Sequence, residues 1–182
     1  MRIIVFLKYD MLEYKENAER ELFKLRWIGE DIESYVKQKE YIDTIILPLY
    51  PISFTSSIET TVEMTEYISF ITVLLEKQFK GRLLLLPGYS YLKNLEGEMP
   101  VEDLLKWEEE IMNSGSKHLF YLTCDSEWKK VENSLQGSLI WVPTTSIHKM
   151  DAKQRNAHLE DQIKQLSSIF TEKWHREKSE MI

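Results

Sequence analysis

Residues 41–54 read Tyr-Ile-Asp-Thr-Ile-Ile-Leu-Pro-Leu-Tyr-Pro-Ile-Ser-Phe, and this stretch decides the fold. Its apolar residues run without alternation from Ile45 to Leu47, as in a strand buried on both faces, and Pro48 then ends the apolar run. Residues 82–88 and 138–143 have the same form, and residues 118–123 make a fourth apolar run. Segments of helical period separate these runs, which predicts strands and helices in alternation.

Strands that alternate with helices must be mostly parallel, and right-handed crossovers then place helices on both faces of the sheet. We therefore predict an α/β fold, a three-layer α/β/α sandwich with a mostly parallel sheet of about four to five strands, of Rossmann or flavodoxin type. In such a sheet the loops that leave the carboxyl ends of the strands gather along one edge, where ligands bind.

Helices are predicted between these strands from their apolar periodicity and their end signals. Residues 27–38 have a helical apolar stripe, and Ser56 with Glu59 forms a capping box that starts a helix ending near Phe79. A loop is expected at residues 89–99. The final helix starts at Asp151, and its stripe consists of Leu159, Ile163, Leu166, Phe170 and Trp174.

The composition excludes several classes of protein. A formal net charge of -7 and a pI near 5.2 argue against a nucleic-acid binder, which needs Lys and Arg to neutralise phosphates. A single cysteine, Cys124, excludes an internal disulfide and favours a reducing compartment. Because no stretch is long and uncharged enough to span a bilayer, we expect a cytoplasmic protein.

The expected carboxyl edge gathers hydroxyl and carboxylate side chains that suit a small polar ligand. The candidate ligand-binding residues are Ser53, Thr55, Ser56, Tyr89, Tyr91, Thr123, Asp125 and Glu127. The hydroxyl-rich residues 53–57 precede a helix, as in flavodoxin-like phosphate sites. However, they contain no glycine that would let a phosphate approach the backbone, and helix capping explains them equally well.

Nucleophilic, metal and cofactor chemistry find little support in the chain. The carboxylates of Asp125 and Glu127 beside Cys124 oppose ionisation of its thiol, and His118 lies at the far end of the same strand. The four histidines are isolated from one another, and no cysteine pair exists. We therefore predict no catalytic residue, no metal site and no cofactor, and interpret Cys124 as a structural residue with Asp125 as a helix cap.

Several segments in order resemble the YpiF-type family, a domain of unknown function from low-GC Gram-positive bacteria. They are Trp27 and residues 31–44, 47–49, 51–54, 78–82, 118–123 and 125–128. The resemblance extends from about residue 25 to the C-terminus and implies no activity. Members begin at a Met-Lys-Trp-like start that matches Leu25 to Trp27. We therefore expect residues 1–24 to be an N-terminal extension from an upstream start codon, and residues 25–182 to form a single α/β domain.

The strand at residues 46–49 is also distantly similar to a strand of creatininase-like amidohydrolases. In that family, the following loop brings a glutamate and a histidine to a pair of metal ions. Residues 50–54 of this chain offer neither side chain, so any kinship implies loss of the metal chemistry.

These observations leave functions of two classes. We favour a non-catalytic module that binds a small polar ligand or a protein partner. The alternative is a small-molecule hydrolase or transferase at the carboxyl edge, with Asp125 or Glu127 as general base and Ser53, Tyr89 or Tyr91 orienting the substrate. A homodimer built through the final helix is a further alternative.

Overall fold

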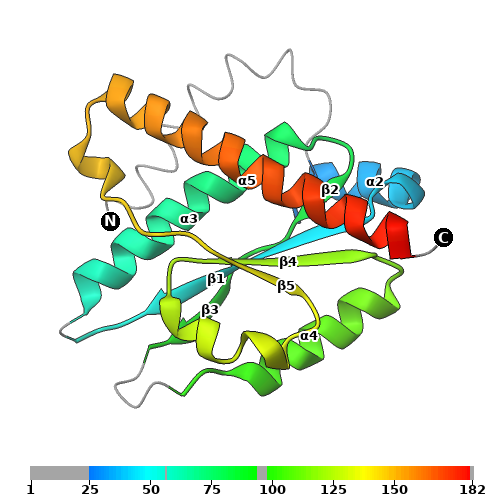
Figure 1. The fold of residues 1–182 in the computed structure, drawn as a ribbon, viewed down its shortest axis with the longest axis horizontal. Coiled ribbons are helices and arrows are strands. Elements are labelled where there is room, and N and C mark those ends of the chain that lie inside the picture. Colours follow the sequence, from blue (N-terminus) through cyan, green and yellow to red (C-terminus); the bar gives the residue numbers. More distant parts are fainter. Residues whose placement is uncertain (1–24, 56, 94–97, 181–182) are drawn as a thin grey trace.

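A computed structural model describes residues 25–55, 57–93 and 98–180, with the side chains of residues 176–180 excepted. Strands are labelled β and α-helices α in Figure 1 and below, and short 3-10 helices are named η in the text. In chain order the elements are α2 (Gly29–Gln38), η2 (Lys39–Tyr41), β1 (Thr44–Ile52), α3 (Ile58–Gln78), β2 (Leu83–Leu85), β3 (Tyr89–Leu92), α4 (Val101–Asn113), β4 (His118–Thr123), η3 (Ser126–Lys130), η4 (Glu132–Ser134), β5 (Ser138–Trp141), η5 (Ile147–Lys149) and α5 (Ala152–Glu180).

The five strands form one parallel sheet in the order β2-β1-β4-β5, and β3 also pairs with β1. β2 pairs with the first part of β1 and β3 with its second part. The Leu86 amide donates to the Ile46 carbonyl and the Lys93 amide to the Ile52 carbonyl, so both bonds lie on the same edge of β1. If β2 and β3 are counted as one interrupted strand, the order is 2-1-3-4, as in flavodoxin-like sheets. The predicted α/β fold is confirmed.

Helices cover both faces of the sheet, as Figure 1 shows. α3 and α5 lie on one face over a core that includes Ile46, Phe120 and Phe170. α4, η3 and α2 lie on the other face over Leu47, Tyr121 and Trp128. Adjacent residues of β1 and β4 belong to opposite cores because side chains alternate along a strand.

The final helix packs as its periodicity predicted. Leu159, Leu166, Phe170 and Trp174 are buried, and Ile163 packs against the same core. The capping pair also forms, since the Gln154 amide donates to Asp151 Oδ1 at 2.8 Å and the Asp151 amide donates back to Gln154 Oε1. The apolar stripe of α5 is therefore used within the chain, and a homodimer through this helix stays a prediction.

β1 continues to Ile52 through two prolines, so the proline that ends the apolar run does not end the strand. Backbone groups of alternate residues point to opposite edges of a strand, so Pro48 faces the same side as Ile46. There it lies between the last β2 pair, Ile46 with Leu85, and the first β3 pair, Leu49 with Tyr89. Pro51 faces the β4 side, past the final pair with that strand. Neither missing N–H is needed by the ladder.

Two expectations require correction. Residues 89–92 are not loop but strand β3, whose side chains Tyr89 and Tyr91 face the core under α4. The stripe of the first helix packs only in part, because α2 begins at Gly29 and Trp27, Ile28 and Val36 are exposed. Residues 1–24, predicted to be an N-terminal extension, lie outside the described residues. Ser56, predicted to form a capping box with Glu59, lies outside them too.

Residues 25–27 extend the sheet beyond β2 by one bridge. Arg26 pairs in parallel with Leu85, whose amide donates to the Leu25 carbonyl and whose carbonyl accepts from the Trp27 amide. The buried Glu76 of α3 accepts from the Leu25 amide at 2.8 Å. The chain then leaves this edge at Ile28, the residue before α2.

Within the part of the chain that is described, every helix is too short or too polar to cross a lipid bilayer.

Gly88 is a site where a side chain would disturb the sheet. A Cβ there would lie 1.8 Å from Cε2 of Tyr50, whose hydroxyl accepts from Ser69 of α3. We predict that Gly88→Ala lowers the free energy of unfolding by about 1–3 kcal/mol, because the half-enclosed ring must move. Gly29→Ala is the matched control, since no atom lies within 4 Å of its added Cβ. Urea unfolding of both variants checks this, and equal stabilities would contradict it.

Candidate functional site

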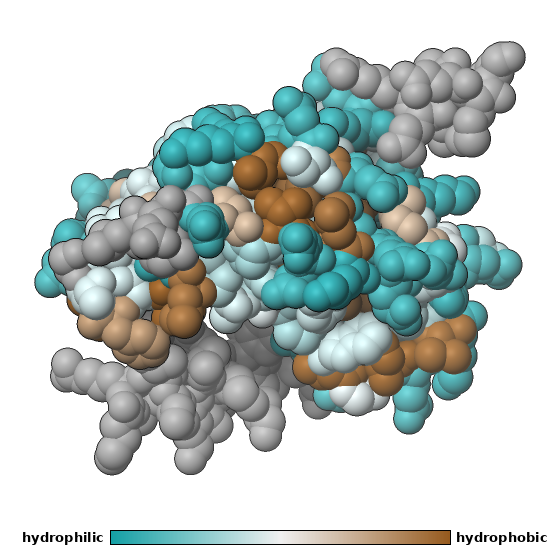
Figure 2. Space-filling model, turned by 90° about the horizontal axis from the view of Figure 1, so that it is seen from below, coloured by the Kyte–Doolittle hydropathy of each residue, from teal (hydrophilic) through white to brown (hydrophobic). Residues whose placement is uncertain are grey.

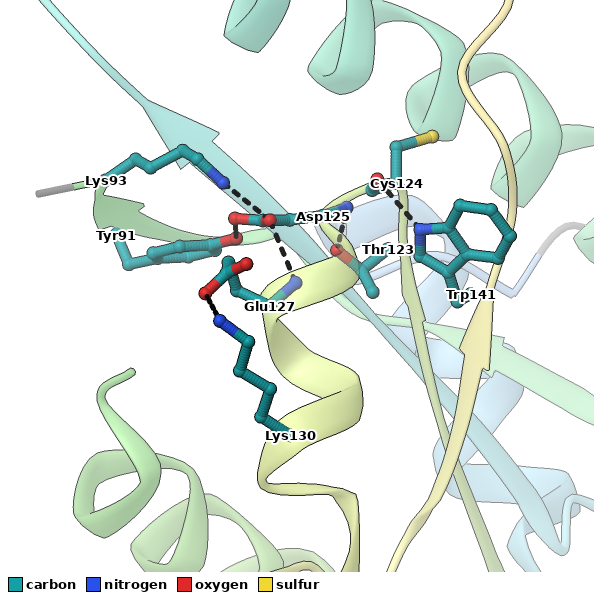
Figure 3. A network of polar contacts seen from close by, with 8 residues as sticks. All are labelled: Tyr91, Lys93, Thr123, Cys124, Asp125, Glu127, Lys130 and Trp141. Atoms are coloured by element: carbon teal, nitrogen blue, oxygen red, sulfur yellow. Dashed lines mark hydrogen bonds and ion pairs between the residues drawn. The ribbon is translucent and has the colours of Figure 1, made fainter. Parts of the chain in front are cut away.

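The candidate residues that the structure describes lie around the carboxyl half of β1: Ser53 and Thr55 follow β1, Tyr89 and Tyr91 belong to β3, and Thr123, Asp125 and Glu127 lie at or just beyond the end of β4. This place is the topological switch point of the sheet, because the chain leaves β1 towards β2 and later crosses to β4 on the other side of β1. Tyr91, Thr123, Asp125 and Glu127 are brought into one polar network, shown in Figure 3. Ser53 and Thr55 follow β1 and form a separate contact.

Asp125 is the centre of this network and is 1% exposed. Its Oδ2 accepts from the Tyr91 hydroxyl at 2.9 Å, and its Oδ1 accepts from Lys93 Nζ and from the Glu127 amide. Its own amide donates to Thr123 Oγ1 at 3.0 Å. The Glu127 bond is the N-cap of η3, so the predicted capping role of Asp125 is confirmed.

The network crosses the central strand. In the sheet register Tyr91 pairs with Pro51 of β1, whereas Asp125 follows β4 on the opposite side of β1. The Tyr91 hydroxyl therefore spans β1 to reach the carboxylate. Burial, the charge of Asp125 and the hydrogen bond to it raise the pKa of Tyr91, in that order of size, so the phenol stays a donor.

Lys93 is the residue that sequence reasoning missed. It lies in the stretch predicted as a loop and has no motif around it, but its ammonium makes an ion pair with Asp125. Its side chain is 27% exposed and covers the buried carboxylate from the solvent side. The only signal available in the sequence was the alternation of Tyr89, Tyr91 and Lys93, which is typical of a strand.

The remaining candidates make local contacts. Ser53 Oγ lies 3.2 Å from Thr55 Oγ1 and accepts from the Thr55 amide, which closes a tight turn after β1. The Tyr89 hydroxyl donates to Asp103 at the start of α4, 3.4 Å away. Glu127 pairs with Lys130 one turn on, at the surface. These side chains therefore do not converge with Asp125 on one open position.

Cys124 is buried, and its thiol is not poised for reaction. Burial, with a smaller effect from the Asp125 carboxylate, raises its pKa to about 12. Its carbonyl accepts from Trp141 Nε1 at 3.0 Å, so the segment is held on both sides. Among the described residues, no group of three or more His, Cys, Asp or Glu side chains could hold a metal ion.

The same edge carries a second feature, an apolar rim. We use this name for Phe54, Ile58, Val62 and Leu92, which are 80%, 45%, 54% and 70% exposed. Ile58, Val62, Thr65 and Ser69 lie on one face of α3. On this face Thr65 Oγ1 donates to the Pro51 carbonyl and Ser69 Oγ donates to the Tyr50 hydroxyl. Leu92 is in register with Ile52, two residues before Phe54. The rim therefore surrounds the end of β1.

Exposed hydrophobic residues are not spread evenly over the molecule. Figure 2, a view from below, shows them in separate patches that hydrophilic side chains divide. The rim residues differ from single exposed side chains because they come from the turn after β1, the first turns of α3 and the end of β3, all of which lie around the carboxyl end of β1.

Comparison with known proteins gives a family but no activity. A family described as "Protein of unknown function (DUF2487)" matches residues 33–174. The uncharacterized protein YpiF of Bacillus subtilis (strain 168) is 27% identical over 150 residues, which cover 82% of this chain and 98% of that protein. No solved structure matches.

Removal of the Asp125 carboxylate should destabilise the fold strongly. Asp125→Ala leaves the Tyr91 hydroxyl and the Lys93 ammonium without their acceptor, and we expect a loss of about 3 kcal/mol in the free energy of unfolding. Glu127→Ala removes only a surface ion pair and should cost less than about 1 kcal/mol. Denaturant unfolding of both variants measures the difference, and an Asp125→Ala protein as stable as the parent would disprove the assigned role.

Cys124 should resist thiol reagents in the folded protein. With a pKa of about 12 against roughly 8.5 for a free thiol, the thiolate fraction at pH 8 is about a thousandfold smaller than in an unfolded chain. We expect labelling of the native protein to be slower than labelling in denaturant by at least that factor, because burial also blocks access. Comparable rates in the two conditions would show that the thiol is accessible and reactive.

Proposed function

The chain belongs to the DUF2487 family of proteins of unknown function, and we propose that it acts as a non-catalytic protein-binding module whose partner docks on the apolar rim. The supporting observation is the contrast between the two halves of the carboxyl edge. In the polar half the Asp125 carboxylate is already bonded by Tyr91 and Lys93, while the apolar half is exposed. A filled edge beside an exposed apolar patch is the arrangement of an interaction surface.

The polar half offers little to a substrate. A general base must accept a proton from its substrate, but both oxygens of Asp125 already accept hydrogen bonds, and its charge is balanced by Lys93. The crevice where flavodoxin-like sheets hold a ligand is occupied by the Tyr91 and Lys93 side chains. The hydrolase or transferase alternative would require the Lys93–Asp125 ion pair to open first.

The apolar half has the properties of a docking site. Phe54 and Leu92 are large side chains that are more than two-thirds exposed, and nothing among the described residues packs over them. Burial of such side chains contributes roughly 1.5–3 kcal/mol each. Large apolar side chains also dominate the energy of protein interfaces. A partner that covers the rim would therefore gain most of its affinity from these residues.

Selection from a random peptide library displayed on phage tests the proposal. The folded chain is the bait, and the double variant Phe54→Ser/Leu92→Ser is the comparison. We expect peptides that bind the parent chain in the micromolar range and lose at least tenfold in affinity for the double variant. Both substitutions are at exposed positions, so the free energy of unfolding should change little.

Leu105→Ser serves as the matched control, because Leu105 of α4 is an exposed apolar residue on the opposite face of the sheet. The selected peptides should bind this variant as tightly as the parent. Binding that survives the double variant, or a selection that enriches no peptide, would overturn the proposed function.

A further inference from the structure

We propose that the partner binds as an extended strand that adds to the free edge of β3, with apolar side chains over the rim and basic residues at its flanks. This inference rests on the proposed function and names the form and chemistry of its partner. Three features of the described residues support it. Backbone groups of β3 point away from the sheet, residues 25–27 pair with the outer edge of β2 but not with that of β3, and carboxylates lie beside the rim.

The first feature is the direction of the β3 backbone. The Lys93 amide donates to the Ile52 carbonyl, and alternate residues of a strand face alternate edges, so Tyr89, Tyr91 and Lys93 direct their backbone groups towards β1. Ser90 and Leu92 therefore direct theirs away from the sheet. Within the described part of the chain β3 pairs with β1 alone. An edge with unpaired N–H and C=O groups is a template for another strand.

The second feature is that residues 25–27 pair with the outer edge of β2 but do not reach β3. Residues 25–27 bridge to β2 at Leu85, seven residues before Leu92. After Trp27 the chain turns into α2 and leaves the sheet. Among residues 25–55, 57–93 and 98–180 the covering of this edge thus ends at β2, and a strand from a partner would continue it along β3.

The side chains on this edge match an added strand. Ser90 and Leu92 are in register with Tyr50 and Ile52, and Tyr50 contacts Ser69 of α3, so Ser90 and Leu92 lie on the α3 face of the sheet. Val62 lies on the stripe of α3 that faces the end of β1. A neighbouring strand with apolar residues at every second position would place them against Leu92 and Val62.

The third feature is the charge beside the rim. Glu59, Val62 and Glu66 follow one another at helical spacing on α3, and both carboxylates are accessible to solvent. The chain as a whole carries a formal net charge of -7. Lys93, the nearest cation on β3, is already paired with Asp125. Basic residues in the partner would therefore meet the carboxylates of Glu59 and Glu66, the second of which already lies 3.7 Å from His148 Nδ1.

Amide hydrogen exchange measured by NMR tests the mode of binding. The probe is the synthetic peptide Lys-Val-Thr-Val-Thr-Val-Lys, which alternates apolar residues between basic ends, added to the full chain. We expect saturation to slow exchange of the Ser90 and Leu92 amides at least tenfold. The Tyr91 amide, which already donates to β1, should change far less. A helix bound in the same place would leave all the outward amides unprotected.

A proline at the edge provides the mutational test. Ser90→Pro removes one outward N–H without removing a ladder bond to β1, and should weaken the peptide at least tenfold while the fold is retained. Ser90→Thr keeps the N–H and should bind as the parent does. Replacement of both flanking lysines by glutamate should weaken binding several-fold at low salt, and this difference should shrink as salt is added.

The outcomes separate the mode of binding from the function itself. Unchanged exchange at Ser90 and Leu92, or full affinity in Ser90→Pro, would overturn strand addition even if library peptides still require Phe54 and Leu92. Equal affinity of the glutamate-flanked peptide would overturn the choice of a basic partner. If no peptide requires the rim, the proposed function fails together with this inference.

Discussion

Strand β1 is paired along both edges and buried on both faces, and this double constraint organises the structure. The backbone N–H and C=O groups of its odd-numbered residues point to β4, and those of its even-numbered residues point first to β2 and then to β3. The sheet therefore extends from β1 in both directions. The requirement to satisfy every buried backbone group is strict. It explains why both prolines occupy positions where no ladder bond is lost. It also explains why the edge strand is interrupted at residues 86–88, opposite Pro48.

The polar network at the carboxyl edge follows from the same constraint. Where β1 and β4 end, the chain places a carboxylate, Asp125, in a site that water does not reach. A buried charge is tolerated only when it is paired and hydrogen-bonded. Tyr91 and Lys93 supply these partners from the far side of β1. The network therefore joins β3 to the start of η3 across the carboxyl end of β1.

The apolar rim is exposed because β1 ends beside it. α3 begins beyond the sheet, so its first turns have no strand beneath them, and Ile58 and Val62 stay exposed where Thr65 and Ser69 make contacts. β3 has no second neighbour among the described strands, so Leu92 is exposed as well. An exposed apolar group beside an open strand edge is hazardous for a protein that only needs to fold. This is a physical reason to interpret the rim as a surface with a partner.

The amino-acid sequence by itself determined the fold class, the alternation of strands and helices, the packing stripe of α5 and the Asp125 cap, because these depend on periodicity and on contacts within a few residues. The YpiF-like family was also recognisable from the sequence alone. Strand β3, the passage of β1 through its prolines and the Lys93–Asp125 pair were decided only by the tertiary structure. Each depends on which residue lies across the sheet, and residues 32 positions apart leave no local pattern. For the same reason the sequence predicted a gathering of polar groups at the carboxyl edge but not that these groups would satisfy one another.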